Sequence, residues 1–368
     1  MLARRMQRIE ESGIRKIFNR IGDIKDPIDL SIGQADFDVP AEVKKAAIAA
    51  IEEGFNRYTV TQGIAELRRK VSELFRRKHG IATDNVLITS GAAGGLTLAI
   101  LALLDEGEEA LIPDPYFIVY KNSVAAVGGV PVIVDTYPDF KLTPARIRAA
   151  VTPKTKLLFL NNPTNPTGAA YSGAELKAIA AEAKKHGLLI ISDEIYDTFC
   201  YDFPHETMLR HTEDCVVVNA FSKTYGMPGW RVGYAVAPRE ICEAMTVLQQ
   251  FSFVCAPSPF QKACARALDL DTSKITEDYR RKRDFVTESL SKRYDFVHPG
   301  GAFYVFPRVP WGTDEEFVKA AIDEKLLIVP GGACSRLKTH FRISYAASDR
   351  TLERGVEVLN RLAERRGR

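Results

Sequence analysis

Apolar runs that alternate with helix-like segments constrain the fold of this 368-residue chain most strongly. Each run is apolar almost throughout, as expected of strands that are buried on both faces of a sheet. Their alternation with helices predicts an α/β protein whose large domain has a mostly parallel sheet covered by helices on both faces. The expected strands are 86–89, 109–113, 130–134, 156–160, 188–191 and 215–219, and the expected helices are 40–54, 64–79, 96–104, 116–127, 143–151 and 175–186.

The pattern changes after the proline-containing segment 256–259. A long charged helical region is expected over 260–292, then strands at 303–307, 327–329 and 341–345 and helices at 315–326 and 349–365. We interpret this part as a smaller α+β domain, joined by an amphipathic N-terminal arm in which Ile14, Ile17, Phe18 and Ile21 recur at helical spacing. The predicted division is 1–40 for the arm and part of the small domain, 41–260 for the large domain and 261–368 for the small domain.

The charge balance gives no reason to expect a nucleic acid or a membrane as partner. The chain has 50 basic and 47 acidic residues, a formal net charge of +3, and no apolar run approaches membrane-spanning length. The six cysteines form no C-x-x-C pair and are expected to be reduced thiols. Because the N-terminus also lacks an apolar signal core, we expect a cytoplasmic protein.

Lys223 stands where an expected buried strand gives way to a loop rich in glycine and proline. A lysine amine that is largely desolvated there loses its proton more readily and becomes a nucleophile toward a carbonyl group. Arg231, in the same segment, presents the planar fork that binds a phosphate. The pair points to a Schiff base with pyridoxal phosphate. The alternative is an ordinary solvated lysine beside Ser222.

The segment 90–95 (SGAAGG) follows an expected strand and precedes a helix. Bare amides and the positive end of a helix dipole form an anion site at such a junction. The segment has neither the glycine spacing of dinucleotide-binding proteins nor the Gly-Lys-Ser/Thr of a P-loop. The segment is therefore interpreted either as a phosphate site or as a simple tight turn.

Ligands of open parallel sheets bind beyond the carboxyl ends of the strands. Gly91, Asn165, Asp193 and Lys223 each follow an expected strand at that end, so we expect them to lie together. Asp193 would keep a pyridine nitrogen protonated, which makes the ring an electron sink; the alternative is a helix cap or a salt bridge. Asn165 and Tyr196 would donate to the phenolic oxygen of the same ring.

Arg342 lies inside the apolar run 341–345 and needs an anionic partner there. A substrate carboxylate would satisfy it. The alternative is a structural carboxylate such as Asp349 or Glu315.

These motifs occur together and in one order along the chain. They are GQADF (33–37), YTVTQG (58–63), NPTG (165–168), DEIY (193–196), SKTYGMPGWRVG (222–233) and RISY (342–345). The chain resembles the class I/II aminotransferases, fold-type I pyridoxal-phosphate enzymes of the aspartate aminotransferase kind, over nearly its whole length. The resemblance implies an enzyme that moves an amino group from an L-amino acid to a 2-oxo acid by a ping-pong mechanism through a Lys223 Schiff base.

The resemblance also implies a role for each matching residue. Lys223, Asp193 and Tyr196 match the catalytic residues, with Lys223 as the proton carrier. Gly33, Asn165 and Arg342 match the residues that bind the substrate, and no metal is implied. The implied cofactor-binding residues are Gly91, Ala92, Ala93, Phe117, Asn165, Asp193, Tyr196, Ser222, Lys223, Arg231 and Tyr58.

Within this set, Phe117 matches the aromatic residue that stacks on the cofactor ring. The backbone amides of Ala92 and Ala93 fall where they cup the phosphate, and Arg231 falls where it clamps it. Tyr58 resembles the tyrosine that reaches the phosphate of the neighbouring subunit. The resemblance therefore implies a homodimer with shared active sites.

Several positions depart from the family pattern. Ala220 stands where many members have a phosphate-binding serine, and Ser222 or Ser258 would have to replace that contact. Ala35 stands where proline is usual, and Cys334 where an aromatic residue is commoner. Ala93 stands where one subgroup has a lysine for the distal carboxylate, which weakens the case for aspartate as donor. Phe251 and Phe253 either line a pocket for an apolar side chain or belong to the core.

Two other functions are open at this stage. A C–S β-lyase on the same scaffold would eliminate from the same carbanion, since a fold does not fix reaction type. A non-catalytic ligand sensor fused to a DNA-binding domain is less favoured, because the chain begins almost directly with the aminotransferase pattern. The preferred amino donor cannot be read from the sequence, since pocket contacts worth only ~1–3 kcal/mol decide it.

Overall fold

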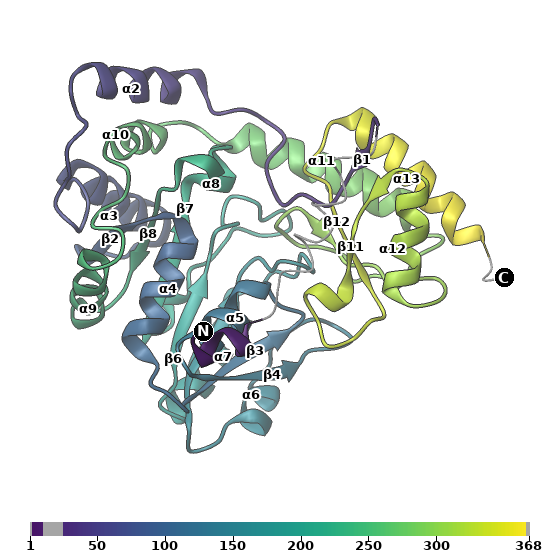
Figure 1. Ribbon diagram of the computed structural model, residues 1–368, viewed down its shortest axis with the longest axis horizontal. Coiled ribbons are helices and arrows are strands. Elements are labelled where there is room, and N and C mark those ends of the chain that lie inside the picture. Colours follow the sequence, from purple (N-terminus) through teal and green to yellow (C-terminus); the bar gives the residue numbers. More distant parts are fainter. Residues whose placement is uncertain (1, 10–24, 366–368) are drawn as a thin grey trace.

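A seven-stranded sheet forms the centre of the larger unit in the computed structural model, which describes residues 2–9 and 25–365 (Figure 1). Only β8 runs antiparallel to its neighbours, β2 and β7; the other neighbouring pairs are parallel. The mostly parallel sheet predicted from the sequence is therefore confirmed. In spatial order the strands are β2 (Val86–Thr89), β8 (Gly233–Val236), β7 (Cys215–Ala220), β6 (Leu189–Asp193), β5 (Thr155–Asn161), β3 (Glu109–Asp114) and β4 (Val130–Asp135).

Helices cover both faces of this sheet and bury two separate hydrophobic cores. Successive residues of one strand enter different cores: Val217 lies in one, and Val216 and Val218 in the other. This alternation explains why the strands are apolar at nearly every position. The helices of the larger unit are α2 (Ala41–Glu52), α3 (Ala65–His79), α4 (Gly91–Leu103), α5 (Ile118–Ala126), α6 (Pro144–Ala150), α7 (Gly173–Lys185), α8 (Phe221–Thr224), α9 (Arg239–Gln250) and α10 (Ser258–Ala267).

The helix α4 begins at Gly91, whereas the sequence predicted a start at residue 96. Glycine is a poor helix former, and a run of small residues after a strand predicts a tight turn. The reason for the glycines is close packing: a Cβ at Gly95 would lie 3.0 Å from a methyl group of Val218. Tertiary packing therefore extends this helix through residues of low intrinsic propensity.

A second, smaller unit packs at the carboxyl edge of the large sheet (Figure 1). Its core includes Ile28 and Leu30 from the N-terminal segment. The proposed helical arm residues Ile14, Ile17, Phe18 and Ile21 lie outside the described residues. The elements of this unit are β1 (Ile28–Asp29), paired with β10 (Leu326–Leu327); the antiparallel strands β11 (Val329–Pro330), β12 (Phe341–Ser344) and β9 (Tyr304–Val305); and the helices α11 (Ser273–Leu290), α12 (Asp314–Asp323) and α13 (Asp349–Glu364).

The single helical region expected over 260–292 is two helices, α10 and α11, separated by residues 268–272. Ala263 and Cys264 of α10 belong to a core of the larger unit, whereas Tyr279 of α11 belongs to the core of the smaller one. We therefore propose that the domain boundary lies at 268–272 rather than at 260.

Candidate active site

A cavity of about 280 Å³ lies at the carboxyl edge of the large sheet, where the smaller unit meets it. Its volume is near the lower end, roughly 300 Å³, of small-molecule sites. The structure brings together here most of the residues that the sequence singled out. Those that line the cavity are Gly33, Ala92, Ala93, Phe117, Asn165, Asp193, Tyr196, Ser222, Lys223, Arg231 and Arg342.

Lys223 projects from the short helix α8, directly after β7. Its Nζ donates a hydrogen bond to the carbonyl oxygen of Gly33, in the N-terminal segment. Burial, and then the nearby positive charges of Arg342 and Arg231, lower the pKa of this amine to about 8, while Asp193 opposes the shift. The amine is therefore not an ordinary solvated lysine, and a useful fraction of it is unprotonated near neutral pH.

Asp193 is the last residue of β6 and is buried. Its Oδ2 accepts a hydrogen bond from Tyr120 Oη at 2.7 Å, and its Oδ1 accepts one from the backbone amide of Ile195 at 3.3 Å. Burial raises the pKa of this carboxyl to about 6, against the hydrogen bond from Tyr120. Among the described residues no salt bridge to Asp193 was found, which leaves its charge available to a ligand.

The N-terminus of α4 and the Arg231 side chain form a cradle for an anion. Arg231 donates to the carbonyl oxygens of Pro228 at 3.0 Å and Ser90 at 3.4 Å, and no carboxylate within the described ranges pairs with it. Its φ of 56° is strained for a residue with a side chain, as at many ligand sites. Gly91, at φ +68°, leaves the space: a Cβ there would lie 2.7 Å from Arg231 Nη2. Positive charge and free amides suit a phosphate group.

Arg342 reaches the cavity from β12 and is only 3% exposed. It donates to the carbonyl oxygen of Ser31 at 2.7 Å and to Asn165 Oδ1 at 3.0 Å, while its Nε has no partner. The two structural carboxylates considered from the sequence bind elsewhere: Asp349 pairs with Arg281 and Glu315 with Lys338. This guanidinium is therefore a buried cation without an acidic partner among the described residues, and a ligand carboxylate would suit it.

The three other residues expected to contact the cofactor ring lie in different parts of the large unit. Asn165 follows β5, and its side-chain oxygen accepts from Arg342, so the amide nitrogen is the group that faces a ligand as donor. Tyr196 Oη lies 2.9 Å from Tyr304 Oη. Phe117 stands at the N-terminus of α5. All three line the same cavity as Lys223 and Asp193.

Four residues considered from the sequence lie outside the cavity lining in this single chain: Gly91, Tyr58, Ser258 and Phe251. Gly91 is adjacent to it, as described. Tyr58 is on the surface, 81% exposed. Ser258, one suggested replacement for the missing serine at position 220, donates to the carbonyl oxygen of Arg57 at 2.6 Å, whereas Ser222 does line the cavity. Phe251 is 85% exposed, so it does not belong to the core of the chain.

Sequence reasoning missed three polar residues that line the cavity: Tyr120, Asn161 and Tyr304. Asn161 faces Asp193 in the register of β5 and β6, and its position as a polar end to an apolar strand was a usable signal. Tyr304 stacks under the Arg342 guanidinium at 4.7 Å. It lies in an apolar run that looks like core, so the sequence carried no signal for it.

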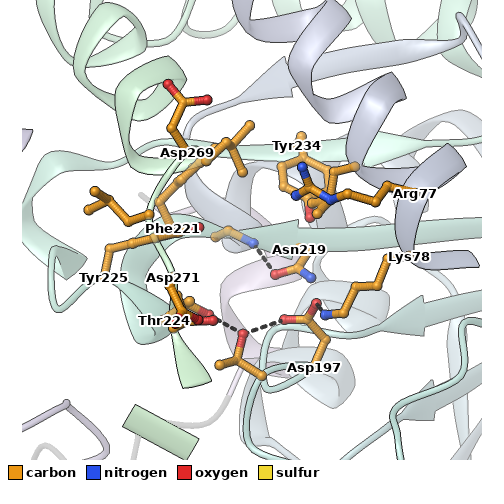
Figure 2. A pocket seen from close by; sticks show the side chains of 16 residues that line it. Arg77, Lys78, Asp197, Asn219, Phe221, Thr224, Tyr225, Tyr234, Asp269 and Asp271 are labelled. Carbon is orange, nitrogen blue, oxygen red and sulfur yellow. Dashed lines mark hydrogen bonds and ion pairs between the residues drawn. The ribbon is translucent and has the colours of Figure 1, made fainter. Parts of the chain in front are cut away.

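A larger cavity of about 660 Å³ also borders α8 (Figure 2). It is lined by Phe221 and Thr224, whereas the smaller cavity is lined by Ser222 and Lys223. Three of its charged residues are paired: Lys78 with Asp197 at 2.7 Å (Figure 2), and Asp269 with Lys70 at 2.5 Å. None of the predicted site residues lines it, so we place the candidate active site in the smaller cavity.

The described parts of the chain hold no group of three or more histidine, cysteine or acidic side chains that could bind a metal ion. None of the helices described combines the length and the apolar character that a membrane span requires. The side chains that line the smaller cavity have the chemistry that an organic cofactor needs. A low-pKa amine, a buried carboxylate and a phosphate cradle at the carboxyl edge of a mostly parallel sheet define a fold-type I pyridoxal-phosphate enzyme.

The chain belongs to the class I and II aminotransferases, whose family model matches residues 25–359. It is 35% identical to the aspartate aminotransferase of Pyrococcus abyssi, over 97% of both chains. It is also 35% identical to an aromatic-amino-acid aminotransferase of Thermococcus litoralis, over 98% of both chains. The solved aspartate aminotransferase of Thermus thermophilus with maleate superposes with a TM-score of 0.94 at 34% identity, covering 98% of this chain and 99% of that one.

The protein is thus a pyridoxal-phosphate-dependent aminotransferase that acts on amino acids and 2-oxo acids. The aminotransferase relatives do not favour the C–S β-lyase considered from the sequence.

Proposed function

We propose that this enzyme transfers the amino group of an L-amino acid to a 2-oxo acid by a ping-pong mechanism in which Lys223, Asp193 and Tyr196 are the catalytic residues. The observation that carries the proposal is the buried Arg342 guanidinium, which has no acidic partner among the described residues and faces the same cavity as Lys223. It suits the α-carboxylate that every amino acid and 2-oxo acid substrate shares.

The residues present fit the cofactor at each of its polar groups. Arg231, Ser222 and the amides of Gly91, Ala92 and Ala93 would hold the phosphate. Asn165 and Tyr196 would donate to the ring oxygen, Asp193 would pair with the ring nitrogen, and Phe117 would cover the ring face. When bound, pyridoxal phosphate supplies an electron sink for the substrate's α-carbon.

Lys223 has two proposed tasks. Its Nζ is the amine that would hold the cofactor covalently, and the same amine, when free, would take up the proton that leaves the substrate's α-carbon. A pKa of about 8 suits both, because the unprotonated amine is the nucleophile and the base. Arg342 and the backbone of Gly33 would fix the substrate carboxylate, so that the α-carbon lies within reach of Nζ.

We further propose a cytoplasmic homodimer with shared sites. Tyr58, Val60 and Phe251 are all more than half exposed, which an interface would cover. Tyr58 would then complete the phosphate site of the partner subunit. The cytoplasmic location accords with six cysteines that are all free thiols.

The test is the absorption spectrum of the purified holoenzyme, recorded before and after single amino acids are added. We expect a Schiff-base band that is lost with particular donors and returns with a 2-oxo acid. Lys223→Ala should abolish the band, whereas the exposed-lysine control Lys338→Ala should keep it. Wild-type turnover by Lys223→Ala would refute the assignment. Release of pyruvate with ammonia or thiol would instead indicate a lyase.

A further inference from the structure

The Asp193 carboxylate accepts a hydrogen bond from one buried side-chain hydroxyl group, that of Tyr120 on α5. We propose that Tyr120 is a positioning residue that keeps Asp193 ionised and correctly oriented toward the cofactor's ring nitrogen. The proposal rests on the role proposed for Asp193 and adds a residue that no motif in the sequence pointed to.

The geometry of the contact is that of a strong hydrogen bond to a charged acceptor. Tyr120 Oη lies 2.7 Å from Asp193 Oδ2, and both residues are buried, Tyr120 being 2% exposed. A tyrosine hydroxyl has one proton, so donation to Asp193 uses it fully. The only other donor recorded for this carboxyl within the described residues is the amide of Ile195, at the longer distance of 3.3 Å.

Aromatic neighbours hold the Tyr120 ring in place. It stacks on Phe159 of β5 with ring centroids 5.1 Å apart and an interplanar angle of 24°. The edge of Phe117 meets it at 5.7 Å and 84°. Because Phe117 also lines the cavity, Tyr120 connects the side chain proposed to cover the ring face with the one proposed to hold the ring nitrogen.

The charged and titratable groups that face Asp193 come from three elements: Tyr120 on α5, Tyr196 after β6 and Lys223 on α8. Burial disfavours the carboxylate, whereas the Tyr120 hydrogen bond and the Lys223 charge favour it. Burial and the Asp193 charge hold the pKa of Tyr120 well above its usual value. Tyr120 therefore keeps its proton, and remains a hydrogen-bond donor, at any pH near neutrality.

Removal of the hydroxyl would make Asp193 more basic. The proton that Asp193 and the ring nitrogen share would then move toward the carboxyl oxygen, and the ring nitrogen would lose its positive charge. No proton is gained or lost by the site in this exchange. The expected consequence is weaker cofactor binding as well as slower turnover.

The first measurement uses protein without cofactor, so that it does not depend on activity. The infrared carbonyl band of protonated Asp193 is followed against pH, with Asp193→Asn as the blank. In Tyr120→Phe we expect its midpoint to rise by about one to two pH units, because one charge-assisted hydrogen bond is lost. Tyr294→Phe is the matched control: this buried tyrosine donates to the carbonyl oxygen of Leu359 at 2.6 Å in the smaller unit, and its loss should leave the midpoint unchanged.

A second variant tests the opposite direction and covers the case in which Tyr120→Phe fails to fold. A fluorinated tyrosine at position 120 is a more acidic donor and should lower the Asp193 midpoint. The dissociation constant of pyridoxal phosphate should rise about tenfold or more in Tyr120→Phe and stay unchanged in Tyr294→Phe.

An unshifted midpoint in Tyr120→Phe, or a midpoint that the fluorinated residue does not lower, would overturn the inference. The role of Asp193 is tested separately. If Asp193→Asn binds cofactor and turns over like the wild type, the proposed function of Asp193 fails. If only that variant is impaired and Tyr120→Phe is normal, the inference about Tyr120 fails alone.

Discussion

Asn165 Oδ1 accepts a hydrogen bond from Arg342 Nη1 at 3.0 Å, although 177 residues separate them in the sequence. Asn165 follows a strand of the large sheet, and Arg342 lies on β12 of the smaller unit. The contact therefore ties the two units together at the cavity. It also means that the groups proposed for the cofactor ring and for the substrate carboxylate are set against each other directly.

Replacement of Arg342 by alanine should weaken every substrate. The lost contact is to the carboxylate that all of them carry, so we expect kcat/KM to fall about 10- to 100-fold for each donor, mainly through KM. The control is Arg281→Ala, which removes an exposed pair with Asp349. A loss confined to acidic donors would mean that Arg342 binds the side-chain carboxylate of the substrate and not its α-carboxylate.

A pair of glycine substitutions separates backbone strain from damage to the phosphate cradle. Gly91 and Gly80 have nearly the same φ, +68° and +71°, so alanine at either should cost about 1 kcal/mol of folding free energy. Only at Gly91 would the added Cβ press on Arg231; at Gly80 no atom lies within 4 Å. We expect Gly91→Ala to lose affinity for pyridoxal phosphate in a direct titration and Gly80→Ala to keep it. Equal affinities would place the phosphate elsewhere.

The sequence predicted the parallel strands well because burial on both faces leaves a continuous apolar signature. It did not predict β8, since an antiparallel strand between two others is selected by its partners and not by its own four residues. The predicted start of α4 was wrong for a similar reason, because packing against Val218 outweighs the low helix propensity of the glycines.

The residues of the candidate site also fall into those that the sequence predicted and those that it did not. Residues at the ends of strands, such as Asp193 and Lys223, carry a signal because charge is unusual there. Tyr120 and Tyr304 carried none, because a tyrosine in an apolar run is ordinary core. Their contacts span 73 and 108 residues of sequence and exist only after the chain has folded.

The depressed pKa of Lys223 predicts a pH-dependent stability of the cofactor-free enzyme. A lysine with a pKa of about 8 when folded, against 10.5 in the unfolded chain, adds stability above pH 10.5 that is lost as the pH falls through 8. Lys223→Met should therefore be more stable than the wild type at pH 7, by roughly 3 kcal/mol, and the difference should shrink between pH 8 and 10.5. Chemical denaturation at a series of pH values measures it. A constant difference would show that Lys223 is not the titrating group.

The exposed aromatic surface predicts how the subunits associate. Phe251 is 85% exposed, and a buried interface is the simplest reason to keep a large apolar side chain outside the core. Phe251→Asp should place a charge in that interface and yield a monomer by sedimentation velocity, with much reduced affinity for pyridoxal phosphate because Tyr58 of the other subunit is withdrawn. Leu337→Asp, at a residue that is 42% exposed on the smaller unit, is the control and should leave association unchanged. If Phe251→Asp sediments like the wild type, this surface is not the interface. If it is monomeric but binds cofactor normally, the sites are not shared and Tyr58 has no part in them.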